Sequence, residues 1–349
     1  MEYDTTLENY IGTRHHGRLD HGASGSREMQ VDLSELDGYV ALVQRASDDL
    51  KAVKSGASSS VTQSDFGPIL ELMMGSYNSL VPKLHTALEE DGTRMADHAE
   101  ALKATARDFT LTEAGVSQTY GGKSYDGRNG STAFGDAVET TLARPRATQG
   151  ELPKVSFGQP YDIVCDLIAM LTGFDIRAEL AEKIGGDTVG ASTQGSSWGS
   201  LGKSVSAVAT NLEAGRHTVS GTWSGTASDS ARNNMGQWVG MLDSQAGKMI
   251  EMGQNVVQIC KDAWETAMCV VETIKSAVQA VSSALATMSI PGIGWARVVQ
   301  ACYQAFQALM KAFNVLKKFF NILKSVKSYI EMVKDFFNPD ELPSATATA

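Results

Sequence analysis

The chain contains few of the residues that build disulfide scaffolds, zinc sites or β-sheet proteins. Its 349 residues include 4 cysteines and 8 prolines, aromatic residues make up 7 %, and no Cys-x-x-Cys pair occurs. We therefore expect free, buried thiols rather than a disulfide framework or a structural metal site. No stretch alternates polar and apolar residues convincingly, whereas several repeat apolar residues at helical spacing. The sequence thus predicts an all-α protein.

Residues 1–30 lack the apolar segment of a signal peptide, and we expect them to form a disordered, polar arm. The net charge of −10 makes nucleic acid an unexpected partner. Positive charge is nevertheless concentrated in residues 294–335, which contain seven basic residues and only two acidic ones, Glu331 and Asp335. The preceding stretch, 276–296, has no charged residue. It is long enough to cross a bilayer, but its polar residues and Pro291-Gly292 argue against a permanent span.

The tripeptide Trp223-Ser224-Gly225 lies between two segments with helical apolar spacing. Glycine supplies the unusual backbone angles of a tight break, so the pattern predicts a helical hairpin with an indole at its tip. The stripe before the tip comprises Trp198, Leu201, Val205, Val208, Leu212 and Val219. The stripe after it comprises Leu242, Met249, Val256, Ala263, Val270 and Ala277.

This layout resembles the Trp-x-Gly (WXG) family of small helical hairpins exported by type VII (ESX) secretion systems. The resemblance implies a non-enzymatic, actinobacterial protein without a cofactor, exported without a cleaved signal peptide or cytoplasmic before export. It further implies a substrate, effector or adaptor, with a secretion ATPase or chaperone as partner. Trp223 and Gly225 would then form a recognition element. The alternative is that Trp223 plugs the end of the helical core.

The first part of the chain, residues 31–115, repeats the hairpin plan with Phe66-Gly67 in place of the Trp-x-Gly tip. Its stripes run through Leu33–Val53 and Ile69–Phe109. This half resembles the companion hairpins of the same systems, several of which carry a Tyr-x-x-x-Asp/Glu signal after the second helix. Phe109 and Glu113 stand at that place, with phenylalanine instead of tyrosine. The alternative is a core phenylalanine followed one turn later by a solvated glutamate.

We expect residues 116–197 to be a flexible linker with short helices, and residues 198–288 to be the second hairpin. The two hairpins are predicted to pack into an elongated four-helix bundle. Residues 289–349 are predicted to form a long basic amphipathic helix and a polar tail. Its heptad seam runs through Trp295, Val299, Cys302, Phe306, Leu309, Phe313, Leu316, Phe320 and Leu323.

The last helix leaves two interpretations open. Its seam either packs on the second hairpin, or the helix acts on anionic membranes as a membrane-active or pore-forming element. In the second case the contacts would be Lys311, Lys317, Lys318, Lys324 and Lys327. A homo-oligomer is also compatible with the pattern, and an adaptor acting with a separate toxin domain is a further possibility.

Motifs for catalysis are weak. Gly195–Gly199 matches a Gly-x-Ser-x-Gly elbow, but a Gly/Ser-rich stretch stands where a strand is required. Gly122-Lys123-Ser124 lacks the earlier glycine of a phosphate loop. His15, His16 and His21 have no Cys/His set of structural-site spacing around them. We therefore expect no enzyme activity, no cofactor and no metal.

Overall fold

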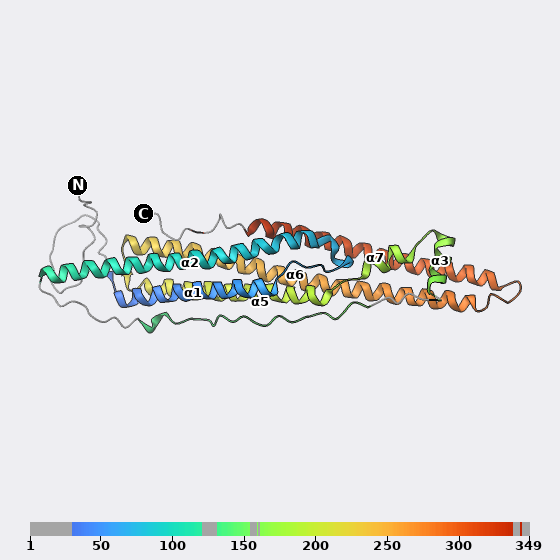
Figure 1. Cartoon of the computed structure of the whole chain (residues 1–349), viewed down its shortest axis with the longest axis horizontal. Coiled ribbons are helices and arrows are strands. Elements are labelled where there is room, and N and C mark those ends of the chain that lie inside the picture. Colours follow the sequence, from blue (N-terminus) through green and yellow to red (C-terminus); the bar gives the residue numbers. More distant parts are fainter. Residues whose placement is uncertain (1–29, 121–130, 154–158, 160, 338–342, 344–349) are drawn as a thin grey trace.

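The computed structural model describes residues 30–120, 131–153, 159, 161–337 and 343, and it shows long helices lying side by side in a rod (Figure 1). The all-α prediction is confirmed. The predicted arm at 1–29 and the end of the predicted tail at 344–349 lie outside the described residues. The long helices are α1 (Leu33–Ser60), α2 (Glu71–Tyr120), α5 (Thr188–Val219), α6 (Thr226–Leu285) and α7 (Gly294–Phe336).

Two aspartates fix where the hairpins begin. The Asp32 carboxylate accepts hydrogen bonds from the backbone N of Ser34 (2.9 Å) and Glu35 (3.2 Å), which caps α1. Asp187 caps α5 in the same way through the backbone N of Gly190 (2.7 Å). These caps satisfy amide groups that have no partner within the first helical turn.

The predicted stripes form the hydrophobic core. Every residue named above for the second hairpin is buried, and so is the first hairpin's stripe apart from half-buried Val40 and Phe109. Helix α1 packs against α2 and α5, and α5 packs against α6. A buried hydrogen bond from Gln245 Nε2 on α6 to Asp91 Oδ1 on α2 (3.3 Å) links the remaining pair. The two hairpins thus contact each other within the chain, through α1 with α5 and through Asp91 with Gln245.

Helix α5 starts ten residues earlier than predicted, and the expectation of a flexible stretch up to residue 197 is wrong for its last part. The glycines there permit close helix packing instead of flexibility. A Cβ added at Gly253 of α6 would lie 2.6 Å from both the backbone O of Gly195 and the backbone N of Gly199. A Cβ at Gly202 would lie 2.8 Å from the backbone O of Ala246. Larger residues would push α5 and α6 apart.

The predicted linker is also more ordered than expected. Helix α2 continues to Tyr120, and residues 132–134 form the short helix η2 (Thr132–Phe134). Residues 135–153, here called the strap, then run as an extended segment along α5 (Figure 1). Side chains on one face of α5 bond to the strap's backbone: Asn211 to Val138, Ser204 to Thr141, Ser196 to Arg146, Ser192 to Thr148 and Thr188 to Gly150. These bonds satisfy the polar backbone of a segment that has no secondary structure of its own.

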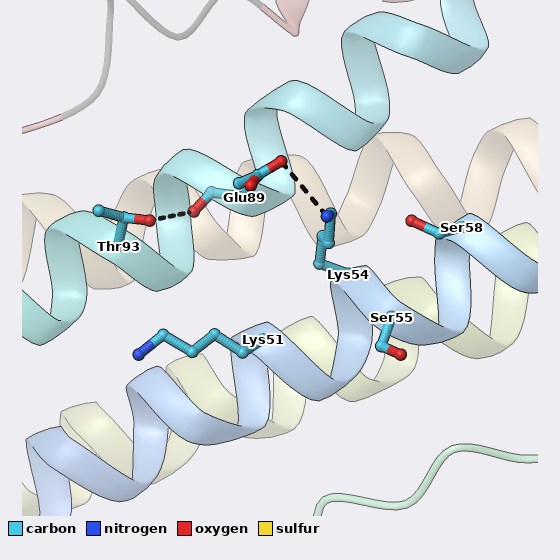
Figure 2. Close-up of a pocket in the computed structure, with 6 residues that line it drawn as sticks. All are labelled: Lys51, Lys54, Ser55, Ser58, Glu89 and Thr93. Atoms are coloured by element: carbon cyan, nitrogen blue, oxygen red, sulfur yellow. Dashed lines mark hydrogen bonds and ion pairs between the residues drawn. The ribbon is translucent and has the colours of Figure 1, made fainter.

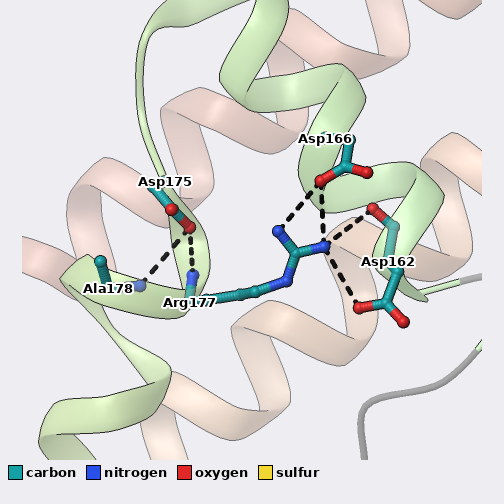
Figure 3. A network of polar contacts seen from close by, with 5 residues as sticks. All are labelled: Asp162, Asp166, Asp175, Arg177 and Ala178. Carbon is teal, nitrogen blue, oxygen red and sulfur yellow. Dashed lines mark hydrogen bonds and ion pairs between the residues drawn. The ribbon is translucent and has the colours of Figure 1, made fainter.

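A small corner precedes α5 and consists of α3 (Tyr161–Thr172), α4 (Ile176–Glu179) and η3 (Ala181–Ile184). Figure 3 shows how Arg177 holds it: the guanidinium lies 3.0 Å from Asp166 Oδ1 and 3.2 Å from Asp162 Oδ1. Asp175 caps α4 through the backbone N of Arg177. The corner places the Phe174 ring 5.9 Å from that of Phe306 and 5.7 Å from that of Phe313.

Helix α7 folds back along α6 and reaches α2. Half of its predicted seam is displaced by one residue. Cys302, Leu309, Leu316 and Leu323 are buried as expected, but Trp295 and Val299 are exposed, and Phe306, Phe313 and Phe320 are only half-buried. The buried partners are the adjacent residues Val298, Ala305, Ala312 and Phe319. Two of these are alanines, whose small side chains allow the closest helix approach, while the phenylalanines cover the flank.

Three of the four cysteines, Cys165, Cys260 and Cys302, are buried free thiols as predicted. Cys269 is also free but exposed, which corrects the expectation for that position. It occupies the outward face of α6 one position before buried Val270.

Candidate recognition site at the α5–α6 turn

The turn between α5 and α6 is built from the Trp-Ser-Gly tripeptide. Trp223 and Ser224 form β2 (Trp223–Ser224), which pairs antiparallel with β1 (Gln30–Val31) at the start of the first hairpin. Ser228 Oγ donates to the backbone O of Trp223 (2.8 Å). Gly225 precedes α6 with φ 108°, a conformation that side chains disfavour. The glycine is therefore needed to turn the chain into α6.

The indole of Trp223 points into the protein. The residue is 2 % exposed, and among the described residues its Nε1 has no hydrogen-bond partner. The sequence left two interpretations of Trp223 open, a recognition element or a core residue at the end of the helical bundle. The burial of the indole fits the core residue. It argues against a partner gripping the indole directly. A role of the turn in recognition stays a prediction.

The structure brings two predicted site residues from different hairpins together. The Phe109 ring of α2 meets the Trp223 ring edge-on, with centroids 6.4 Å apart and an interplanar angle of 81°. Phe109 is half-buried, as expected for a core phenylalanine. Helix α2 then continues eleven residues further, past the turn (Figure 1). Glu113 lies on that continuation, but its side chain lies outside the described part of the structure.

Phe66 and Gly67 lie at the other end of α1, a helix of 28 residues and hence about 42 Å from the Trp223 turn. Phe66 is buried and contacts the ring of Tyr77 edge-on. Gly67, with φ 80°, touches Gly186: a Cβ on Gly67 would lie 2.5 Å from the Gly186 Cα. The backbone N of Asp187 donates to the O of Phe66 (2.9 Å). This tip therefore docks onto the start of α5 and is separate from the Trp223 site.

Sequence analysis missed a buried polar cluster beside the Phe66 turn. Trp198 Nε1 donates to the Tyr77 hydroxyl (3.1 Å), which donates to Gln194 Oε1 (2.6 Å). Gln194 Nε2 in turn donates to Ser64 Oγ (2.7 Å), and the backbone N of Thr62 donates to Gln194 Oε1 (3.0 Å). Burial raises the pKa of Tyr77, so the hydroxyl stays protonated and keeps its donor role. The spacing of Gln194 and Trp198, one helical turn apart, was the available signal.

A shallow hollow of about 480 Å³ lies between α1 and α2 (Figure 2). Its lining groups already interact: Lys54 pairs with Glu89 (3.3 Å), and Thr93 Oγ1 donates to the backbone O of Glu89 (2.8 Å). The hollow holds no histidine or cysteine that would act as a base or nucleophile beside these groups. We find no catalytic arrangement in it.

The structure also bears on the other candidate motifs named in the sequence analysis. Gly195–Gly199 forms helical turns of α5 against α6, so it is not a strand-to-helix elbow. No group of three His, Cys, Asp or Glu side chains suited to a metal ion occurs in the described ranges; His15, His16 and His21 lie outside them, as does Gly122-Lys123-Ser124. The lysines suggested for membrane contact are all exposed on α7: Lys311, Lys317, Lys318, Lys324 and Lys327.

A scan against models of protein families, a search of curated proteins and a search of solved structures each found no match to this chain. Among the helices of the described residues, none combines the length and the apolar character that crossing a bilayer requires.

Proposed function

We propose that this chain is a non-enzymatic helical protein exported by a type VII secretion system, acting as a substrate, effector or adaptor. The observation that carries the proposal is the Trp-Ser-Gly turn, which joins two long helices and meets Phe109 of the other hairpin. Both hairpins resemble type VII proteins in sequence, and the packing of Phe109 on Trp223 supports a shared recognition site.

In this proposal Trp223 acts by shaping the turn. Because the indole is buried, the surface offered to a secretion ATPase or chaperone consists of neighbouring exposed groups. At the turn these are Ser220, Gly221, Thr226 and Ala227. On α2, Leu111 is 60 % exposed two residues beyond Phe109. An apolar side chain on a projecting helix is a suitable anchor for a partner's groove.

A single chain would supply the two hairpins that the resembled family usually takes from two proteins. Together they would act as one elongated four-helix bundle, with the α1–α2 and α5–α6 pairs held by the contacts between α1 and α5. Fusion makes their association intramolecular, which replaces dependence on protein concentration with a high effective concentration. The strap further ties the two pairs together, because its Asp136 pairs with Arg45 of α1 (3.1 Å) and its Val138 bonds to Asn211 of α5.

Export from an actinobacterial host with a working type VII system tests the proposal. We expect Leu111→Asp and Glu113→Ala to lower the fraction of protein in the culture medium while leaving the melting temperature unchanged. Leu72→Asp is the matched control, because Leu72 is exposed on the same helix at its opposite end. Equal export of all variants at equal cellular levels would remove the recognition site from the proposal. Export unaffected by loss of the secretion ATPase would remove the proposal itself.

One observation, the row of exposed lysines on α7, favours the alternative function, a membrane-active protein. The five exposed lysines of α7 leave a basic surface along the rod, while much of the helix's apolar face is already packed against α6. Binding through this surface would be electrostatic, with each lysine contributing on the order of 1 kcal/mol near anionic lipid. Co-sedimentation with anionic vesicles at low and high salt measures it.

A further inference from the structure

The α6–α7 turn forms one end of the rod (Figure 1) and is held by its own backbone. The backbone N of Ile290 donates to the O of Thr287 (3.1 Å), and the N of Gly294 donates to the O of Ile290 (3.1 Å). Gly292 has φ 84°, and a Cβ on Gly294 would lie 2.4 Å from the O of Met288. These contacts define a tight, ordered turn, so the position of its side chains is set by structure.

This turn exposes large apolar side chains. Six of them lie within sixteen residues, each between 40 % and 58 % exposed: Met288, Ile290, Ile293, Trp295, Val299 and Tyr303. Met288, Ile290 and Ile293 lie in the turn itself, and Trp295, Val299 and Tyr303 follow at steps of four residues on α7. Exposed apolar residues scattered singly are normal, but such a concentration at the end of a rod is typical of an interaction surface.

The charges around the turn point to the partner's chemistry. No charged residue occurs from Ser276 to Ala296, and the polar residues of that stretch are uncharged hydroxyl and amide side chains. The nearest charged residue on α7 is Arg297, an exposed cation. On α6 it is Lys275, which lies ten residues before the end of the helix and pairs with Glu272 (3.0 Å). Arg297 lies three residues into α7, about 5 Å along the helix axis from its start.

We propose that the apolar turn, Met288–Val299, inserts into the interfacial region of a lipid bilayer. Ile290 and Ile293 would enter the acyl boundary, Trp295 would lie at headgroup level, and Arg297 would contact anionic headgroups. Tryptophan and basic side chains occupy these depths at membrane surfaces. The spacing to Arg297 limits insertion to about 5–10 Å, the depth of interfacial elements. The inference does not rest on the export proposal, and it uses the tip of the hairpin instead of the lysine-bearing face of α7.

Binding of the full chain to phosphatidylcholine vesicles, with and without phosphatidylglycerol, tests the inference. We expect binding that is stronger with phosphatidylglycerol, and we expect brominated acyl chains to quench tryptophan fluorescence. Trp295 should carry most of that signal, because Trp198, Trp223 and Trp238 are buried. Half-buried Trp264 lies 21 residues before the end of α6, where its Nε1 donates to the backbone O of Glu151 (3.2 Å). Trp295→Phe should therefore abolish most of the quenching while leaving most of the binding.

The decisive comparison uses two triple variants. Ile290→Ser with Ile293→Ser and Trp295→Ser should weaken vesicle binding at least ~10-fold, because three apolar side chains no longer leave water. The matched control changes three similarly exposed residues elsewhere on α7: Val315→Ser with Ile322→Ser and Met332→Ser. The control should bind like wild type, and circular dichroism should show equal helicity for both.

Three results would overturn the inference. The first is no binding of the wild type to either vesicle. The second is an equal loss of binding in both triple variants, which would assign lipid contact to the helix face. The third is self-association that the turn variant abolishes without any vesicle binding, which would assign the turn to a second copy of the chain.

Discussion

Replacement of Asp91 by asparagine should stabilise the protein at neutral and alkaline pH. Asp91 is fully buried on α2, where its Oδ1 accepts a hydrogen bond from Gln245 Nε2 (3.3 Å). Among the described residues, Asp91 Oδ2 and Gln245 Oε1 are buried without a partner. Burial raises the pKa of Asp91 to about 7, more than the hydrogen bond from Gln245 lowers it. A charged carboxylate is thus a cost to the folded state.

The sign and the size follow from linkage. The carboxyl pKa is 3.8 in the unfolded chain and about 7 in the folded one, so the folded protein binds the proton more tightly. The contribution of Asp91 to the free energy of unfolding is therefore most favourable below pH ~4. It decreases as the pH rises to about 7, above which no further loss occurs. A difference of roughly three pH units at about 1.4 kcal/mol each gives an upper bound near 4 kcal/mol. Asp91→Asn removes this cost, and its amide can donate to Gln245 Oε1.

Urea unfolding at several pH values measures the effect. We expect Asp91→Asn to raise the free energy of unfolding by about 2–4 kcal/mol at pH 8 and to change it little at pH 4. The control is Asp97→Asn, an exposed aspartate on the same helix, which should be neutral at both pH values. A variant that is destabilised equally at pH 4 and pH 8 would refute the reasoning, because the effect of the substitution would then not depend on ionisation of the Asp91 carboxyl.

Three further changes test the turn, the strap and the last helix. Trp223→Ala should lower the free energy of unfolding by about 3–5 kcal/mol in urea titrations, as deletion of a buried indole does; a loss under ~1 kcal/mol would contradict the plug. Asn211→Ala removes both hydrogen bonds to the backbone of Val138 (2.8 and 2.9 Å). It should lower the free energy of unfolding by about 1–3 kcal/mol and speed hydrogen exchange of the Val138 amide. Unchanged exchange would show that Asn211 does not anchor the strap. Phe313→Asp should destabilise the protein by about 2–4 kcal/mol because it places a charge against the Phe174 ring. The control, Lys318→Gln, changes an exposed residue of the same helix and should alter stability by less than about 0.5 kcal/mol; equal melting temperatures of the two variants would show that this flank is not packed.

The helices and their buried faces could be predicted because helical periodicity fixes which side chains share a face. The stripe from Trp198 to Val219 is buried throughout, as is the one from Leu242 to Ala277. The seam of α7 shows the limit of that argument. Ala305 precedes Phe306, and each continues a heptad, so the pattern does not say which of them faces α6. The structure buries the alanine, because close helix approach requires a small residue there.

Glycine in α5 shows a second limit. Gly195, Gly199 and Gly202 look like a flexible stretch in a sequence, since glycine has low helix propensity. Against α6, two of these glycines permit a close helix contact: a Cβ on Gly195 would lie 3.1 Å from the backbone O of Gly253, and a Cβ on Gly202 would lie 2.8 Å from the backbone O of Ala246. Whether a glycine-rich segment is flexible or forms a closely packed helix depends here on the presence of a facing helix. Local composition carries no information on that partner, so tertiary packing overrides the local preference.

The candidate site depends on a register that the sequence does not show. Phe109 and Trp223 belong to different hairpins, and their contact requires the start of α1 to align with the start of α6. Two elements set this alignment: the pairing of Val31 with Trp223, and the close approach at Gly215, where a Cβ would lie 2.0 Å from the Leu42 side chain. A two-residue strand is too short to show alternating polar and apolar residues in the sequence. A single glycine does not show in the sequence which residue it packs against. Sliding one hairpin along the other by a helical turn, about 5.4 Å, would separate the two rings, so the site exists only in this packing.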